Sequence, residues 1–418
     1  TRWINVPDHF SGQVLESPEM RQTAARICRD YLHGAWKRVN ADNINLKRIR
    51  FVKRSFRFSG GLSNWLYNVQ LPEGAAPVRG EPRQVLLRIY GQIHGERALE
   101  GLITESVIFT LLSERRLGPK LHGIFPGGRI EEYIPARPLL TKELADPTLS
   151  LMIAEKMGEI HQMQVPISKE PTWLWDTMAK WLDTATDILK NIEDTDAQHL
   201  ENVNAIRTID LNQEIKWFRS LATQQKYPVV FCHNDMQEGN ILLRENSRKP
   251  ELVLIDFEYC SYNYRGFDIA NHFVEWQYDY TLSEYPFFHE RVGAGPTKEQ
   301  KLNFIRSYLR TTGKEGSSEE ERVMAEVKIF ILASHLFWGL WSVVNAKLSQ
   351  IPFGYWVSDN STFIISLFHY FIISLYHYII EMHGFQNILL TGLCCLKTKA
   401  LPRLKGKVSH VWTANDRR

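Results

Sequence analysis

The sequence has few cysteines, and their arrangement supports neither a disulfide framework nor a zinc site. The cysteines are scattered, odd in number and free of C-x-x-C spacing. A reduced cytoplasmic compartment is therefore predicted. The five residues are Cys28, Cys232, Cys260, Cys394 and Cys395.

The sequence also lacks an excess of charge of either sign. Fifty basic and 47 acidic residues among 418 leave a net charge of +3, which excludes a nucleic-acid binder that depends on bulk positive charge. Hydrophobic residues at 44% and charged residues at 23% exclude a disordered or fibrous chain. There is no internal repeat or heptad pattern. Residues 1–13 have no basic stretch followed by an apolar run, so no signal peptide is predicted there.

The N-terminal third is predicted to be rich in β-strands, because its apolar residues mostly alternate and glycines separate the alternating segments. A helix is expected before the first strand, with apolar residues at helical spacing. The expected elements are a helix at 17–39, strands at 50–58 and 65–71 joined by a glycine turn, a strand at 85–90, a helix at 100–114 and two strands within 121–134.

From residue 135 onward, helical periodicity dominates and only short strands interrupt it. The helices are expected at 149–163, at 173–192 and again from 269, and the strands at 229–232, 241–243 and 252–255. The predicted fold class is α+β with two lobes and a cleft between them. The small β-rich lobe takes residues 1–135, the larger, mostly helical lobe takes 136–355, and a hydrophobic tail takes 356–418.

The strongest chemical signal is a loop that follows the predicted strand at 229–232. The strand delivers His233-Asn234-Asp235 into the loop, and Asn240 follows Asp235 by five residues. At this position Asp235 is a candidate general base for an attacking hydroxyl, and Asn240 is a candidate metal ligand.

A second carboxylate, Asp256, comes directly after the predicted strand at 252–255. A carboxylate at a strand end suits Mg²⁺, which prefers oxygen ligands. The spacing from Asp235 through Asn240 to Asp256 is typical of phosphoryl-transfer enzymes. For either aspartate alone, a solvated turn residue is the better interpretation, and the combination favours catalysis.

Upstream, the glycine turn at 59–64 and an isolated Arg88 indicate a phosphate site. The turn can present backbone N–H groups to phosphates, although a Gly-Gly hairpin turn is common. Arg88 is the only charge in an apolar strand, and Glu105 lies on the following helix. Together they match the strand-cation and helix-carboxylate pair that anchors nucleotide phosphates, with an ordinary surface arginine as the alternative.

These stretches resemble the choline/ethanolamine kinase family in its choline-kinase branch. The resemblance covers about residues 17–355 and depends mainly on FCHNDMQEGNILL (231–243), LIDFEYCSYNYRGFDIANHFVEW (254–276) and ASHLFWGLW (333–341). Weaker support comes from SGGLSN, VLLRIYG, ERRLGPKLHGIFP and IEEYIPARPL. The resemblance implies a protein-kinase-like fold and transfer of the γ-phosphate of ATP, with Mg²⁺, to choline and also to ethanolamine. The resemblance further implies that this reaction is the first step of phosphatidylcholine synthesis and that the protein is a homodimer.

The resemblance also implies residue roles. Asp235 resembles the catalytic base, Asp256 the magnesium ligand, and Asn240 an assisting ligand. The implied nucleotide contacts are Ser59, Gly60, Gly61, Leu62, Ser63, Asn64, Trp65, Arg88, Glu105, Glu131, Glu132, Tyr133, Ile134, Pro135, Ala136, Arg137, Gln237 and Asp256, with 131–137 as a hinge strand. The implied acceptor-side residues are Gly61, Leu62, Ser63, Asp235, Asp268, Glu275, Tyr280, Trp338 and Trp341.

The acceptor side can also be derived from helical spacing. Asp268, His272, Glu275 and Asp279 share one face of a helix expected to run from 267, and this mostly acidic stripe suits a cation. A solvated helix face is the alternative. Trp338 and Trp341 lie one helical turn apart, and tryptophans in such positions more commonly pack in the core than bind a ligand. A quaternary ammonium nevertheless needs aromatic faces with carboxylates, because it binds by cation–π attraction.

The sequence departs from the family pattern in two places. Glu132 stands where the family usually has Gln, and Pro352 stands where it has an acidic residue. Beyond Tyr355 the family pattern is lost, and residues 363–380 form an uncharged run of 18 residues. That run is at the lower limit of a membrane span, and a peripheral or buried helix is an equal alternative. A non-homologous segment that folds poorly is a third alternative.

Two other functions remain as alternatives. The first is a binding-only or weakened kinase-like protein, because the altered C-terminal region would change the acceptor side. The second is a protein kinase, which is disfavoured because D-F-E replaces D-F-G and no A-P-E or activation loop follows.

Overall fold

The computed structural model describes residues 18–49, 65–90, 96–192, 200, 203–204, 206–245, 248–291, 293–349 and 353–355. The chain forms two compact units. Unit 1 comprises Thr1–Pro138 with Asn240–Glu258, and unit 2 comprises Leu139–Gly239 with Tyr259–Arg418. The boundary after Pro138 lies close to the lobe boundary expected at 135. The segment Asn240–Glu258 belongs to unit 1, whereas the sequence predicts it in the second lobe.

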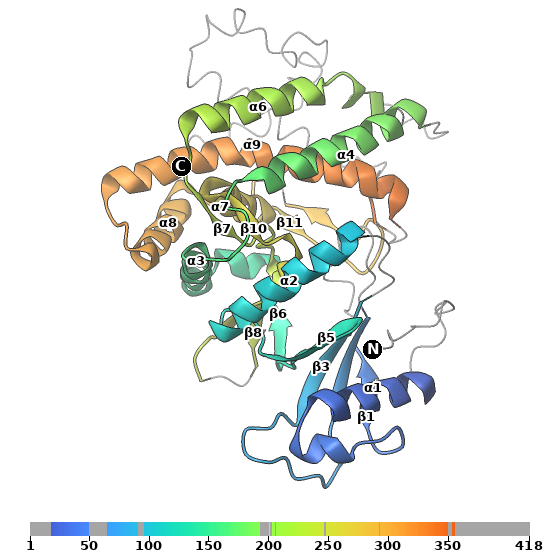
Figure 1. Ribbon diagram of the computed structural model, residues 1–418. Helices are drawn as coiled ribbons and strands as arrows, with labels where there is room; N and C mark the ends of the chain where they lie inside the picture. The colour runs from blue at the N-terminus through green and yellow to red at the C-terminus, as the bar shows by residue number, and fades with distance from the viewer. Residues whose placement is uncertain are drawn as a thin grey trace, which may run out of the picture. The chain divides into compact units, whose positions relative to one another are not determined.

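Unit 1 contains a five-stranded antiparallel sheet in the order β1-β2-β3-β5-β4 (Figure 1). Its strands are β1 (Asn45–Arg48), β2 (Trp65–Gln70), β3 (Gln84–Ile89), β4 (Leu121–Phe125) and β5 (Gly128–Glu132). The predicted pair of strands in 121–134 is confirmed. The first strand begins at Asn45, earlier than the expected 50–58, and that expected segment lies outside the described residues.

Helix α1 (Pro18–Tyr31) covers this sheet, and its Ala24, Ile27 and Cys28 are buried there. The helix is shorter than the predicted 17–39. The chain continues into the 3₁₀ helix η1 (Gly34–Arg38), which begins at Gly34 with a left-handed backbone (φ +55°). Trp36 of η1 donates from Nε1 to the Pro82 carbonyl at 2.9 Å. Helix α2 (Glu96–Glu114) matches its prediction closely.

A second, three-stranded sheet in unit 1 has the order β6-β8-β9. It joins β6 (Ala136–Pro138) to β8 (Ile241–Arg244) and β9 (Leu252–Leu254), with Leu242 opposite Val253. This pairing is the reason that residues 240–258 fold with the N-terminal unit.

Unit 2 is mostly helical, as predicted from the 3- and 4-residue periodicity. Its helices are α3 (Pro147–His161), α4 (Thr172–Asn191), α6 (Leu211–Gln225), α7 (Arg265–Glu275), α8 (Lys298–Thr312) and α9 (Ser317–Leu348). Two short antiparallel pairs complete it, β7 (Val229–Cys232) with β10 (Ser261–Tyr264) and β11 (Tyr278–Asp279) with β12 (His289–Glu290).

Helices α7 and α9 pack closely in the centre of unit 2 (Figure 1). Every residue of α7 is buried, and its Arg265 pairs with the buried Glu326 of α9 at 2.7 Å. Among the described residues, α9 is the one helix long and apolar enough to cross a membrane, but 89% of its apolar stretch is buried in the protein. It is therefore interpreted as a core helix. The uncharged run at 363–380 lies outside the described residues.

Candidate active site

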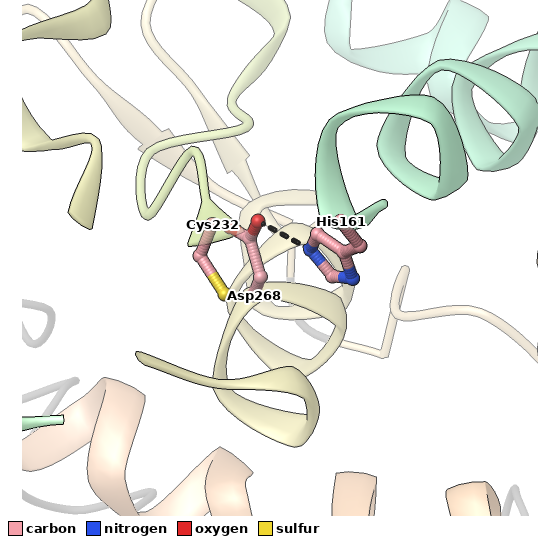
Figure 2. A group of neighbouring side chains, drawn as sticks. All are labelled: His161, Cys232 and Asp268. Carbon is pink, nitrogen blue, oxygen red and sulfur yellow. Dashed lines mark hydrogen bonds and ion pairs between the residues drawn. The ribbon is translucent and has the colours of Figure 1, made fainter. Parts of the chain in front are cut away.

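The loop that carries Asp235 is fixed to α7 by a buried carboxylate, Asp268. Its Oδ2 accepts from the His233 backbone N–H at 2.9 Å and its Oδ1 accepts from the Asn234 N–H at 2.8 Å. His161 of α3 donates from Nε2 to Oδ2 at 3.0 Å (Figure 2). Burial alone would raise the pKa of Asp268, but these bonds and nearby His161 and His233 keep it below its usual range. Asp268 is therefore ionised.

These contacts change the role expected for Asp268. The side chain is fully buried and both of its oxygens already accept hydrogen bonds from the protein. The expectation that it faces a cation is therefore corrected, and Asp268 positions the loop instead. The expected stripe is also shorter, because α7 ends at Glu275 and Asp279 lies in β11.

His161, Cys232 and Asp268 bring their potential metal-ligand atoms within 4.8 Å of one another (Figure 2). His161 is already hydrogen-bonded through both ring nitrogens, to Asp268 and to the Tyr308 hydroxyl. The Cys232 thiol contacts backbone carbonyls, and burial raises its pKa well above the ordinary value. We therefore interpret this cluster as an anchor for the loop.

Two further groups hold the same loop. Asn234 has a left-handed backbone (φ +68°), donates from Nδ2 to the Tyr259 carbonyl and accepts from Asn263 Nδ2, each at 2.8 Å. His272 of α7 contacts the Met236 carbonyl through Nδ1 at 2.8 Å. Burial lowers the pKa of His272 to about 4, so the ring is neutral. Its Nε2 accepts from Trp276, which leaves the proton on Nδ1. The loop is thus fixed on both sides of Asp235.

The magnesium candidates Asn240 and Asp256 both lie in unit 1, at the same end of the β8–β9 ladder. Asn240 directly precedes β8, and its carbonyl accepts from the Ile255 N–H at 3.0 Å. Asp256 follows with a left-handed backbone (φ +64°). Phe257 fixes this turn, because its ring packs at 6.1 Å from that of Phe109 on α2 and a Cβ at Gly118 would lie 2.7 Å from it. One amide and one carboxylate oxygen donor at one strand end fit Mg²⁺.

The expected ion pair between Arg88 and Glu105 is replaced by a longer network. Arg88 donates from Nε to Glu131 at 2.6 Å, and Arg129 donates from Nε to the same oxygen at 2.7 Å. Arg129 also donates from Nη1 to Glu105 at 2.7 Å. Arg129 has no recognisable signal in the sequence, because only the strand register places it opposite Arg88.

The expected hinge strand at 131–137 is divided between the ends of two strands. Glu131 is buried in the network with Arg88, so its side chain is occupied, and residues 133–135 connect β5 to β6. Glu132 accepts from the Lys120 backbone N–H at 3.1 Å and from Arg244 at 3.3 Å. The glycine turn at 59–64 lies outside the described residues, and Trp65 begins β2. Gln237 accepts from the Gly239 N–H through Oε1 at 2.8 Å.

Unit 2 contains a group of aromatic rings around the two predicted tryptophans. Trp338 donates from Nε1 to Asn271 of α7 at 2.6 Å. Its ring centroid lies 6.0 Å from that of Tyr259 and 5.8 Å from that of Trp341. The Trp341 ring in turn lies 5.8 Å from that of Tyr355. Tyr259 was not among the predicted site residues, although it lies within the family-like segment 254–276.

A buried acidic pair lies near the end of α7. Glu275 is one turn beyond Asn271 and accepts from the Tyr280 hydroxyl at 3.1 Å. Glu238 accepts from the Thr141 hydroxyl at 3.2 Å. Burial raises the pKa of each carboxyl to about 8. Repulsion from Glu238 adds to the effect at Glu275, and repulsion from Asp279 adds to it at Glu238. A cation beside Glu275 would favour its ionised form.

Comparisons with known proteins show to which family the chain is similar. The profile described as choline/ethanolamine kinase matches residues 56–365, ten residues beyond the limit expected from the sequence. A human choline/ethanolamine kinase is 47% identical over 347 residues, covering 81% of this chain and 83% of that protein. A rat choline/ethanolamine kinase is 45% identical over 358 residues, covering 84% and 86%. The crystal structure of a choline kinase from Cryptosporidium parvum is 27% identical, covers 87% of this chain and 97% of that chain, and has a TM-score of 0.67.

The structural match confirms the predicted α+β, two-lobed, protein-kinase-like fold. The profile covers well over half of the chain, and the relatives exceed 30% identity over most of their own length. The chain belongs to the choline/ethanolamine kinase family.

Proposed function

We propose that this chain phosphorylates choline and ethanolamine, with ATP and Mg²⁺ as co-substrate and metal. The observation that carries the proposal is the way the loop presents Asp235. Asp268 holds the two residues before Asp235, and His272 holds the residue after it. A base fixed in this manner suits transfer to a small hydroxyl, where positioning supplies most of the catalysis.

In the proposed reaction, Asp235 accepts the proton of the acceptor hydroxyl as its oxygen attacks the γ-phosphorus of ATP. The bond from that phosphorus to the bridging oxygen breaks, and ADP leaves. Asp256 and Asn240 would hold the magnesium, which supplies neutralisation of phosphate charge. Arg88 of β3 is the proposed cationic contact to the same phosphates.

The acceptor is proposed to bind in unit 2. The faces of Trp338 and Trp341 suit a trimethylammonium group, and Glu275 supplies the opposite charge. A primary ammonium can donate hydrogen bonds to Glu275 instead. Both alcohols are therefore proposed as substrates.

The experiment compares three acceptors with purified protein and MgATP. ADP release is measured by a coupled assay with choline, ethanolamine or a Ser/Thr peptide, and the product is identified by ³¹P NMR. We expect saturable turnover with both alcohols and none with the peptide. A phosphorylated peptide, or ADP release independent of any acceptor, would contradict the proposal.

A cytoplasmic location is also proposed. It is supported by the three described cysteines, Cys28, Cys232 and Cys260, which are buried and form no disulfide with one another. The homodimer and a membrane contact through residues 363–380 stay predictions.

A further inference from the structure

Four charged side chains alternate in sign through the interior of unit 1. From the inner strand to the helix they are Arg88 (β3), Glu131 and Arg129 (both β5), and Glu105 (α2). Each successive pair is joined by a contact of 2.6 or 2.7 Å, so the four form one continuous chain with no net charge. We call them the charge relay.

The strand register explains why the charge relay needs Glu131. Arg88 and Arg129 are directly opposite in the β3–β5 pair, where like charges repel each other. Glu131, two residues along β5, lies on the same face as Arg129 and accepts from the Nε of both arginines through one oxygen. This oxygen therefore holds two guanidinium groups that would otherwise separate.

Arg129 is the central member of the relay. Its side chain is only 4% exposed, and its Nη1 donates to both Glu105 and the Tyr90 hydroxyl, the latter at 2.8 Å. Its guanidinium lies 4.1 Å from the ring centre of Phe109, and that ring packs against Phe257 beside Asp256. Burial alone would lower the pKa of Arg129, but the two glutamates raise it above its ordinary value, so the charge is permanent.

We infer that Arg129 is a positioning residue for the nucleotide, which transmits the position of α2 through Glu131 to Arg88. The inference rests on the proposed function, because it takes Arg88 as a phosphate contact. Arg88 uses Nε for Glu131, so its Nη groups are not engaged there and can serve phosphates. In protein kinases a strand lysine pairs directly with a helix glutamate. Here two further side chains of β5 lie between them.

Removal of Arg129 has two physical consequences for Arg88. The relay changes from neutral to a net charge of −1, which opposes the anionic phosphates. Glu131 also loses one of its two guanidinium partners, so it competes more strongly for the Nη groups of Arg88. Both consequences weaken nucleotide binding, and neither acts directly on the acceptor.

The test compares Arg129→Met with Arg129→Lys and with a matched control in unit 2. The control is Arg265→Met, which removes another buried arginine from an ion pair with Glu326. Binding of ADP is measured by calorimetry without acceptor, and KM for ATP and for choline and the melting temperature are measured for each variant. We expect Arg129→Met to weaken ADP binding and raise KM for ATP about tenfold, with KM for choline changed by less than about twofold. Arg129→Lys should recover part of the loss, and Arg265→Met should lower the melting temperature without a change in nucleotide affinity.

A second measurement approaches the relay from its helical end. The Glu105 side chain is 19% exposed, so Glu105→Gln is expected to fold even if Arg129→Met does not. It should weaken ADP binding several-fold, and the double variant should bind ADP no more weakly than Arg129→Met alone. Additive effects of the two substitutions, or normal ADP binding in both folded variants, would overturn the relay.

The outcomes also separate the relay from the function on which it rests. If the wild-type chain binds ADP but phosphorylates neither alcohol, the proposed acceptor is wrong while the relay is still tested by ADP binding. If Arg88→Met leaves ADP binding unchanged, Arg88 is no phosphate contact and the relay has no nucleotide to position.

Discussion

Replacement of Asp268 by Asn separates a loop-positioning role from a cation-binding role. The carboxylate accepts three hydrogen bonds inside the protein, from the backbone of His233 and of Asn234 and from His161. An asparagine amide has one acceptor oxygen, and its NH₂ group can only donate. At least one buried N–H of the loop therefore loses its acceptor in the variant.

The magnitude follows from the number of bonds changed. A buried donor left without an acceptor costs about 1–3 kcal/mol, and the remaining bonds lose the strengthening from the negative charge. We expect a loss of stability of about 2–4 kcal/mol, which for a unit of this size lowers the melting temperature by roughly 5–10 °C. Displacement of Asp235 by about 1 Å would lower kcat on the order of 10²-fold.

The assay measures kcat and KM for choline and the melting temperature of Asp268→Asn beside wild type. The positioning role predicts a lower kcat and melting temperature with KM for choline changed by less than about twofold. Asp268→Glu serves as a control that keeps the charge, and it should retain more of the melting temperature. A tenfold rise in KM with kcat and melting temperature unchanged would show that Asp268 binds the cation and that our assignment is wrong.

Three further predictions test the metal, the aromatic rings and the acidic pair. Asp256→Ala should abolish turnover without rescue by excess Mg²⁺, because the variant lacks the carboxylate, whereas full rescue would assign it a minor role. Trp338→Ala should raise KM for choline more than KM for ethanolamine, at about 0.5–2 kcal/mol for a lost cation–π contact, and equal losses would indicate packing alone. Because the pKa of Glu275 is raised to about 8, above its unfolded value, the free protein should lose stability as pH rises toward 8, while KM for choline should fall. Glu275→Gln should flatten the profile of KM for choline and reduce the slope of stability with pH, to which Glu238 still contributes. An unchanged slope of both properties in that variant would exclude Glu275 as a source.

Much of the fold could be predicted from the sequence because it depends on local periodicity. Helices α3 and α4 and strands β7, β8 and β9 begin and end within two residues of their predicted positions. Helix α6 was not predicted, because its apolar positions are diluted by polar residues. Strand β10 was missed because its polar and aromatic sequence, SYNY, gains its partner only through pairing with β7.

The candidate site was less predictable, because its contacts depend on register and burial. Spacing identified Asp235, Asn240 and Asp256, but it could not show that Asp268 turns both oxygens toward the loop. Likewise, Arg129 becomes a member of the charge relay only when β5 is paired with β3. Helical spacing also failed for Asp279, because α7 ends four residues before it.

The most direct test of the account is the turnover of Asp235→Asn with choline and MgATP. The variant keeps the size of the side chain and removes the base, so ADP binding should stay within about twofold of wild type while kcat falls by at least about 10²-fold. Both values come from the same purified sample, by calorimetry and by coupled ADP release. A kcat near that of wild type, with normal ADP binding, would contradict the role of Asp235 as the general base and with it the proposed mechanism.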